Sequence, residues 1–201
     1  MDKQLSPTSQ RMQRRIIDAV VETVAGSGLS GTTLALIARN AGVSQGVVVF
    51  HFKTKDALLA ETLHRLSGEY HAIWQQALCA PDPLDRVTGL VRADFSPEIC
   101  TPKKLALWFA FWGEAGAEPL YNAICARSEQ IRYEAMAGAC ADLVARHGGP
   151  NPALLAETID AMTDGLWLQM HIYGTRVRRA AALETALAHL RLLLPGLAAR
   201  I

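Results

Sequence analysis

Apolar residues at helical spacing, interrupted by glycine and proline, constrain this chain more than any other feature of its sequence. In residues 10–25, Ile17, Val20 and Val24 recur three and four positions apart, and a Gly-Ser-Gly run follows at 26–28. This spacing places side chains on one face of a helix, and glycine ends such a helix. The alternating pattern of a half-buried strand occurs nowhere in the sequence, nor does an internal repeat. The sequence therefore predicts an all-α fold.

Further helices follow from the same interruptions. Residues 34–41 and 45–52 form two short helical segments, and a longer one runs from Lys55 toward residue 79. Prolines and one glycine-rich loop divide the remainder at Pro81, Pro83, Pro97, Pro102, Pro119 and 148–152. We predict the last helices at about 120–147, 153–174 and 179–194.

The charge of the chain is unevenly distributed. All 201 residues together carry a net charge of +1, but residues 1–55 hold seven basic against three acidic residues, a net of +4 that leaves −3 for residues 56–201. A basic N-terminal quarter on a mildly acidic remainder is typical of a protein that presents one end to nucleic acid phosphates. Half of the residues are apolar, which is enough for a sizeable core.

Several kinds of site and location are excluded by what the sequence lacks. Its four cysteines lie far apart, without the paired spacing of a zinc site, so we expect reduced thiols, no metal and no cofactor. No apolar run approaches the roughly 18 residues of a membrane span, and the polar N-terminal segment lacks the apolar stretch of a signal peptide. We therefore expect a cytoplasmic protein. No catalytic motif surrounds its histidines and serines, so we do not expect an enzyme.

Residues 33–52, TLALIARNAGVSQGVVVFHF, contain the motif that indicates function. The first helix of this segment has a one-sided apolar stripe, Gly42 ends it, and Ser44 is placed to cap the second helix. Such a pair is a helix-turn-helix, whose second helix enters the major groove of DNA by its N-terminal end. For an isolated motif of this kind, plain packing of two helices is the alternative.

The second helix of the motif offers few polar groups for reading DNA. Gln45 can read a base edge with its amide, and Gly46 lets the backbone approach closely. Val47 and Val49 can make only apolar contacts, for instance to a thymine methyl group. Phosphate contacts are predicted for Thr33, His51, Lys53 and Lys55.

The wider segment from Arg14 to Leu59, RRIIDAV...GTTLALIARNAGVSQGVVVFHFKTKDALL, resembles the DNA-binding domain of the TetR family of bacterial repressors. The resemblance implies a three-helix DNA-binding domain in residues 1–55 and a helical ligand-binding and dimerisation domain in residues 56–201. It also implies a homodimer that binds double-stranded operator DNA and releases it when a small molecule binds, with no membrane partner.

The resemblance assigns roles position by position. It makes Thr33 and Lys55 clamps on the DNA backbone, puts Gln45 and Val47 at base edges, and puts Val49, Phe50 and His51 near the groove wall. Together with the motif's own residues, the predicted DNA contacts are Thr33, Ser44, Gln45, Gly46, Val47, Val49, Phe50, His51, Lys53 and Lys55. Val49 stands where the family commonly has a tyrosine that contacts phosphate, and Val47 replaces a common small polar residue. Weaker anchoring, or a different operator, would follow.

Two later segments, 94–121 and 163–169, resemble the corresponding segments of BetI-type repressors. That resemblance implies control of glycine betaine synthesis and a response to choline. The residue types suit a cationic ligand, because aromatic rings and a carboxylate both attract a quaternary ammonium group. The predicted ligand contacts are Trp108, Trp112, Tyr121, Asp164 and Trp167.

Alternatives remain open for these residues. Aromatic side chains at helical spacing are more often part of a core, and Trp167 could instead lie in the dimer interface. The same fold could also sense an unrelated apolar or aromatic compound and control an efflux or catabolic operon. A choline-like ligand should depend on Asp164 or another pocket acid, whereas a neutral ligand should tolerate its loss.

The last helix is the predicted source of the dimer surface. In this family the last two helices of each subunit generally pair into a four-helix bundle. The expected apolar stripe consists of Leu183, Ala186, Leu187, Leu190 and Leu194.

Overall fold

The computed structural model describes residues 6–201, and its regular structure is helical. The α-helices are α1 (Pro7–Ser27), α2 (Leu34–Ala41), α3 (Gln45–Phe52), α4 (Lys55–Leu78), α5 (Pro83–Asp94), α6 (Pro102–Ala115), α7 (Pro119–His147), α8 (Pro152–Tyr173) and α9 (Arg179–Leu193). Short 3-10 helices, η1 (Gly174–Arg176) and η2 (Pro195–Arg200), follow α8 and α9. No strand occurs in residues 6–201, so the predicted all-α class is confirmed. None of the helices in this range is long and apolar enough to cross a membrane.

Proline and small polar residues begin several of these helices. Pro7, Pro83 and Pro152 occupy the first turns of α1, α5 and α8, where the missing N–H would have no partner within the helix. The Asn151 side chain caps α8 by accepting hydrogen bonds from two backbone N–H groups, at 2.9 and 3.1 Å. The helix starts therefore follow local sequence signals.

The chain forms two compact units that alternate along the sequence. Unit 1 consists of the residues through Leu66 together with Ala106–Cys125, and unit 2 consists of Ser67–Leu105 and Ala126–Ile201. Unit 1 thus holds α1, α2, α3, the first half of α4 and most of α6. Unit 2 holds the rest of α4, α5, α8, α9 and most of α7.

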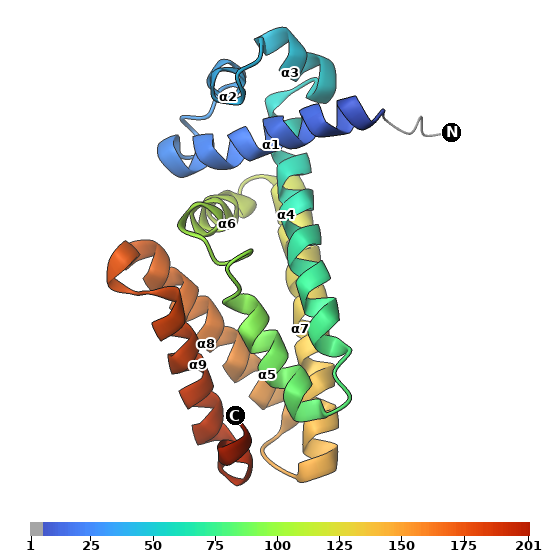
Figure 1. Ribbon diagram of the computed structural model, residues 1–201, viewed down its shortest axis with the longest axis vertical. Helices are drawn as coiled ribbons and strands as arrows, with labels where there is room; N and C mark the ends of the chain where they lie inside the picture. Colours follow the sequence, from blue (N-terminus) through green and yellow to red (C-terminus); the bar gives the residue numbers. More distant parts are fainter. Residues whose placement is uncertain (1–5) are drawn as a thin grey trace. The chain divides into compact units, whose positions relative to one another are not determined.

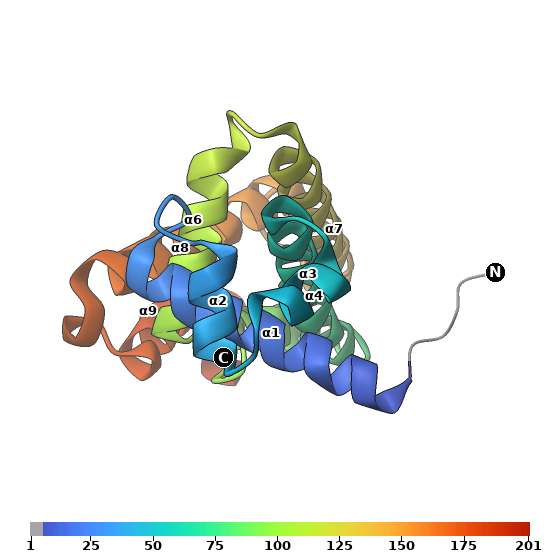
Figure 2. The ribbon, with the colours of Figure 1, turned by 90° about the horizontal axis from the view of Figure 1, so that it is seen from above.

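In unit 1, α2 and α3 lie on the same side of α1 (Figures 1 and 2), with α1 packed against α2 and α2 against α3. The core includes Ile16 of α1, Ile37 of α2 and Val48 of α3, each 0% exposed. The Asn40 amide of α2 also donates a hydrogen bond to Thr23 Oγ1 of α1, at 2.8 Å. Burying each aliphatic side chain contributes about 1.5–3 kcal/mol, so this core holds α3 in a defined orientation.

In unit 2, α8 and α9 run side by side in opposite directions, and both contact α5 (Figure 1). Of the five residues predicted for the dimer stripe, Ala186, Leu187, Leu190 and Leu194 are each at most 3% exposed, and Leu183 is half-buried. The prediction that this stripe forms the dimer surface is wrong, because the core of the subunit already buries it. Other apolar residues of these helices remain in water, with Leu168, Ile172 and Leu192 exposed by 44%, 62% and 80%.

Candidate functional sites

The tight turn between α2 and α3 depends on glycine at position 42. Gly42 has φ 63° and ψ 40°, the left-handed conformation that residues with a side chain rarely adopt. A Cβ there would lie 2.7 Å from Arg15 Nη2, a nitrogen that donates to the Gly42 carbonyl at 3.4 Å. Ser44 then caps α3 by accepting from the backbone N–H of Val47 at 3.4 Å. Turn and cap together determine where α3 begins.

The exposed face of α3 is largely apolar. Gln45, Gly46, Val49 and Phe50 are exposed, and Phe50, at 70%, holds a large apolar ring in water. Val48, on the opposite face, is fully buried. The Gln45 amide gives the exposed face a group that both donates and accepts hydrogen bonds. Such a face can read DNA through one amide and several apolar contacts.

An open groove lies between the start of α1 and this face of α3. Its lining includes Thr8 and Ser9 from α1, and Val47, Phe50 and His51 from α3. The α1 side of the groove thus offers hydroxyl groups beside Met12, and the α3 side offers Val47 and Phe50 beside the polar Ser44 and His51. Hydroxyl groups commonly bond to DNA phosphates, whereas apolar groups contact bases.

Arginines gather beside the turn. Arg11, Arg14 and Arg15 of α1 and Arg39 of α2 line one open hollow in unit 1, together with Gly42 and two acidic residues of α1. Guanidinium groups bind phosphate through parallel hydrogen bonds. The helix-turn-helix motif alone does not predict this group, because three of the four arginines lie on the preceding helix.

Three of the four predicted phosphate contacts, Thr33, Lys53 and Lys55, make hydrogen bonds within the chain, and the His51 ring contacts that of Phe50 edge-on at 5.2 Å. Thr33 Oγ1 caps α2 by accepting from a backbone N–H at 3.1 Å. Lys53 Nζ donates to the Phe50 carbonyl at 2.9 Å, and Lys55 Nζ donates to the Leu29 carbonyl at 3.0 Å. An ammonium group has three N–H bonds, so both lysines keep donors that could meet phosphate.

Three of the predicted ligand contacts, Trp108, Trp112 and Tyr121, belong to unit 1. Trp108 is 2% exposed, and its ring lies 6.0 Å from that of Trp112. The ring of Tyr121 meets that of Phe111 edge-on at 5.0 Å and lines an open hollow with three acidic side chains. Burial, followed by the charge of Asp56, raises the pKa of Tyr121 to about 12. These rings contact other rings, as members of a core do.

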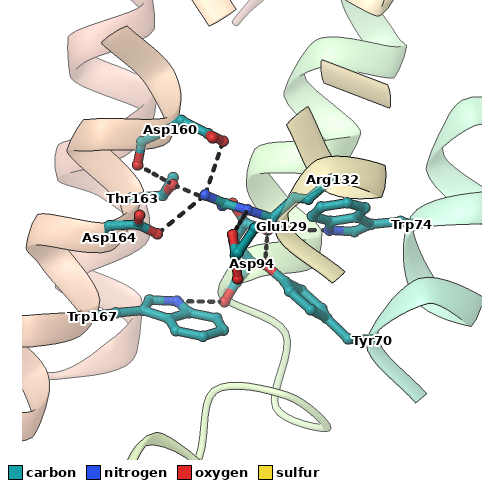
Figure 3. Close-up of polar contacts among 9 residues, drawn as sticks. All are labelled: Tyr70, Trp74, Asp94, Glu129, Arg132, Asp160, Thr163, Asp164 and Trp167. Carbon is teal, nitrogen blue, oxygen red and sulfur yellow. Dashed lines mark hydrogen bonds and ion pairs between the residues drawn. The ribbon is translucent and has the colours of Figure 1, made fainter. Parts of the chain in front are cut away.

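The other two, Asp164 and Trp167, belong to a polar cluster in unit 2 (Figure 3). Its centre is the guanidinium group of Arg132 on α7, a residue that is 4% exposed. Arg132 Nη2 lies 3.0 Å from Asp160 and 3.1 Å from Asp164, Nε lies 3.1 Å from Glu129, and Nη1 lies 3.7 Å from Asp94. We refer to Tyr70, Trp74, Asp94, Glu129, Arg132, Asp160, Thr163, Asp164 and Trp167 as the Arg132 cluster.

Asp94 anchors the aromatic side of the Arg132 cluster. Its Oδ1 accepts from the Tyr70 hydroxyl at 2.5 Å and from Trp74 Nε1 at 3.1 Å, and its backbone carbonyl accepts from Trp167 Nε1 at 2.9 Å. The Tyr70 ring lies 4.7 Å from that of Trp74 and 5.7 Å from that of Trp167. Arg132 Cζ lies 5.9 Å from the Trp74 ring in a cation–π contact. Rings and carboxylates thus surround one cation.

Burial raises the pKa of every carboxyl group in the cluster. For Asp94, burial outweighs the attraction of Arg132, and the pKa rises to about 6. The pKa values of the other three carboxyl groups shift upward for the same reason, with Arg132 opposing the shift. Although burial opposes the charge of Arg132, the surrounding acidic groups raise its pKa, so it remains positive.

The chemistry of this cluster is that of cation binding. No group of three or more His, Cys, Asp or Glu side chains in the described part of the chain is placed to hold a metal ion. Quaternary ammonium groups bind against the faces of aromatic rings, with added attraction from nearby carboxylates. The cluster contains both kinds of group, and Arg132 is the cation that they surround.

Comparison with known proteins matches both parts of the chain. The family model described as BetI-type transcriptional repressor, C-terminal, matches residues 83–195, and the model described as bacterial regulatory proteins, tetR family, matches residues 16–62. The HTH-type transcriptional regulator BetI of Paraburkholderia phymatum is 33% identical over 187 residues, which cover 92% of this chain and 94% of the relative. This chain belongs to the TetR family of transcriptional regulators. Its C-terminal domain is of the BetI type.

Other relatives of this TetR-family protein agree. BetI of Burkholderia ambifaria is 30% identical over 183 residues, covering 90% of this chain and 92% of the relative. A transcriptional regulator from Pseudomonas aeruginosa has a TM-score of 0.79 at 26% identity, covering 98% of this chain and 96% of its own. A regulator from Saccharomonospora viridis, solved in complex with choline, has a TM-score of 0.79 at 19% identity, covering 90% and 96%. This last likeness shows a shared fold.

Membership of the TetR family confirms the predicted class of function. The helix-turn-helix predicted at residues 33–52 falls inside the matched DNA-binding region, and its two helices are α2 and α3. The relatives are transcriptional regulators and not enzymes, as predicted.

The ligand contacts predicted from the sequence include Asp164 and Trp167 but no other residue of the Arg132 cluster. One signal could have found its centre. Arg132 lies four residues before Met136 and eight before Cys140, and both of these are buried on α7. Arg132 therefore occupies a position in an apolar stripe. A charged residue at such a position is rarely buried unless it is paired.

Proposed function

We propose that this TetR-family protein is a homodimeric repressor that releases its operator when choline or a related quaternary ammonium compound binds the C-terminal domain. The observation that carries the proposal is the Arg132 cluster, where aromatic rings and four carboxylates surround one positive charge. The choline bound to the Saccharomonospora viridis regulator supports it, as does the BetI-type family match. On this proposal, the regulated genes serve glycine betaine synthesis.

The proposed DNA-binding domain is residues 1–55, and residues 56–201 bind effector and dimerise. In each subunit α3 enters the major groove, where the Gln45 amide reads a base edge and Val47 and Val49 contact thymine methyl groups. The phosphate contacts proposed for this domain are Thr33, His51, Lys53, Lys55, Arg11, Arg14 and Arg39. Exposure of the α3 face supports this assignment.

The proposed dimer interface is the apolar face of α8 and α9 that the subunit core leaves uncovered. Small and apolar residues recur there at helical spacing, with Ala161, Gly165, Leu168 and Ile172 on α8, and Ala181, Thr185, Ala188 and Leu192 on α9. Leu192 is 80% exposed, and burying such an apolar side chain in an interface would stabilise the dimer. Small residues beside them let two helices approach closely.

Leu192→Glu tests this interface. A buried carboxylate in a helix bundle is costly, so the dimer dissociation constant should rise by at least about tenfold. Sedimentation across a concentration series measures it. The control is Leu120→Glu, because Leu120 is also exposed, by 42%, but belongs to unit 1. Equal dissociation constants for the two variants would contradict the interface.

Effector release requires that the ligand bind two conformations of the dimer unequally. We propose that it favours a conformation whose two α3 helices no longer match major grooves about 34 Å apart. α4 contributes residues to both units, and we propose it as the route of coupling. By reciprocity, operator DNA must weaken choline binding by the same factor.

Binding to DNA upstream of the protein's own coding sequence, with and without choline at one salt concentration, tests the proposal. The expected result is specific binding that choline abolishes and an equal concentration of sodium chloride does not. Specific binding that choline leaves unchanged would discard the effector and keep the DNA-binding role. Equal choline affinity with and without operator, measured by calorimetry, would contradict the coupling.

A further inference from the structure

We propose that Arg132 is a built-in occupant of the effector site, and that a quaternary ammonium compound binds by taking the place of its guanidinium group. The inference rests on the proposed function, because it takes the Arg132 cluster as the place where effector binds. It adds a regulatory element, since the protein carries its own competing cation. The strength of that competitor sets the effector concentration needed for a response.

The negative charge around Arg132 exceeds what one guanidinium group neutralises. Four carboxylates lie 3.0–3.7 Å from its nitrogen atoms. Within the described residues, no hydrogen bond reaches the buried atoms Asp94 Oδ2 and Asp160 Oδ1. Asp160 Oδ1 lies 3.0 Å from Arg132 Nη2, in an orientation that makes an ion pair without a hydrogen bond. The cluster therefore keeps negative charge that Arg132 does not neutralise, and this charge attracts a further cation.

The aromatic surface also extends beyond the guanidinium group. Trp74 carries the cation–π contact with Arg132, and the rings of Tyr70 and Trp167 continue the surface around Asp94 (Figure 3). A planar guanidinium group stacks on one ring face. A quaternary ammonium group is rounded and contacts several rings at once, as in aromatic cages. The Tyr70 ring is inclined by 53° to that of Trp74 and by 35° to that of Trp167, so the three rings face different directions, as contacts to a rounded cation require.

Arg132 can leave the inner part of the cluster without losing all of its partners. The side chain of Asp94 is 2% exposed, whereas those of Glu129 and Asp164 are 37% and 48% exposed. Asp94 and the rings therefore form the inner wall, and Glu129 and Asp164 form the rim. The long arginine side chain can stay paired at the rim while another cation pairs with Asp94. Asp94, the most buried of the four carboxylates, keeps a cation during this exchange, which avoids the large cost of an unpaired buried charge.

The exchange also changes which helices of unit 2 are tied together. Arg132 of α7 donates to Thr163 and Asp164 of α8, at 3.4 and 3.1 Å, and pairs with Asp160 of α8 and with Asp94 at the end of α5. Arg132 keeps Asp164 when it moves to the rim but gives up its contacts with Thr163, Asp160 and Asp94. A quaternary ammonium group has no N–H and cannot restore the lost hydrogen bond. Effector binding thus loosens α7 from α8 and α5, a change inside unit 2 that can favour a second conformation.

The test is the affinity of Arg132→Met for tetramethylammonium chloride, measured by isothermal titration calorimetry at constant ionic strength. Because the variant lacks the competitor, it should bind at least about tenfold more tightly than the wild type. Arg86→Met is the matched control, since Arg86 pairs with Asp142 at 2.8 Å in unit 2 but outside the cluster. The control should bind like the wild type. Unchanged or weaker binding by Arg132→Met overturns the proposal.

Arg132→Lys provides a second variant in case Arg132→Met does not fold. Lysine keeps the positive charge but lacks the planar fork that holds several carboxylates at once. It should compete less well than arginine, so the variant should bind tetramethylammonium about threefold more tightly than the wild type. An affinity at or below that of the wild type overturns the proposal.

DNA release separates this inference from the proposed function. If choline releases the wild type from DNA while neither Arg132 variant gains affinity, the repressor function stands and the built-in cation is wrong. If the variants gain affinity but choline never releases DNA, the built-in cation stands and choline is not the effector that controls DNA binding.

Discussion

The exposed face of α3 and the Arg132 cluster are constructed in opposite ways. The Phe50 side chain of α3 is 70% exposed, so only a binding partner can remove it from water. Arg132 is 4% exposed, and carboxylates and rings of the same chain already surround it. A surface of the first kind is ready to bind, whereas a site of the second kind must first release its own cation. On the proposed function, the first surface performs the resting activity, DNA binding, and the second performs the switch, effector binding.

The largest expected effect tests how far the cluster depends on its inner carboxylate. Asp94→Ala removes the acceptor of two buried donors and one partner of Arg132, so the free energy of unfolding should fall by about 3–5 kcal/mol. Urea denaturation measures it. Asp142→Ala is the control, because it removes an exposed ion pair and should cost under about 1 kcal/mol. Similar losses in the two variants would mean that the cluster stabilises the fold no more than a surface pair does.

On the open surface, Gln45→Ala should weaken operator binding by about 1–3 kcal/mol and relax the preference at one base pair. Lys53→Ala should weaken binding to all DNA sequences alike. The slope of the logarithm of the binding constant against the logarithm of salt concentration should fall in magnitude by about one. Fluorescence anisotropy at several salt concentrations, with operator and scrambled DNA, measures both effects. If Gln45→Ala weakened operator and scrambled DNA equally, its amide would not be reading a base.

A smaller effect is the pH dependence that Asp94 confers. Its pKa in the folded protein, raised by burial to about 6, lies above the unfolded value of 3.8. The folded state therefore takes up the proton first, and the stability that this proton contributes is lost as pH rises from about 4 to 6. From pH 7 to pH 5, the wild type should gain roughly 1 kcal/mol relative to Asp94→Asn.

Urea denaturation of the wild type and Asp94→Asn at pH 5 and pH 7 measures this difference. The asparagine oxygen can still accept from Tyr70 and Trp74, and the other carboxyl groups around Arg132 are common to both proteins. Their titration therefore largely cancels in the comparison. An unchanged difference between the two pH values would mean that Asp94 titrates at its ordinary pKa in the folded state.

The smallest expected effect tests the apolar character of the α3 face. Replacing a contacted thymine by deoxyuridine removes one methyl group, and operator binding should weaken by about 0.5–1 kcal/mol at each such position. The same replacement outside the half-sites is the control and should have no effect. No loss at any half-site thymine would mean that Val47 and Val49 do not meet the bases.

Local features account for most of what the sequence predicts correctly. Thr33 and Ser44 cap the helices that the pattern places after them, and Gly42 adopts the left-handed turn between them. Each of these features involves residues within a few positions of one another. Backbone geometry and hydrogen bonds over such distances depend mainly on residue type, which is why α2 and α3 follow from the sequence.

The errors and omissions concern contacts between distant parts of the chain. Leu187 has the helical spacing of an interface residue, but α9 buries that face within its own subunit. Arg132 is one polar residue in a long helix until α5 and α8 bring Asp94 and Asp164 to it. Periodicity predicts which face of a helix is apolar, but it contains no information about which partner covers that face.

For this protein the sequence by itself determined the helices, the helix-turn-helix, the family and the residue types that a cationic ligand needs. Only the tertiary structure decided which apolar stripe is core, and which cation the carboxylates already hold. The physical reason is the distance along the chain between the residues that interact. Helix periodicity, capping and turns are set within a few residues, whereas burial and charge pairing depend on segments that meet only when the chain folds.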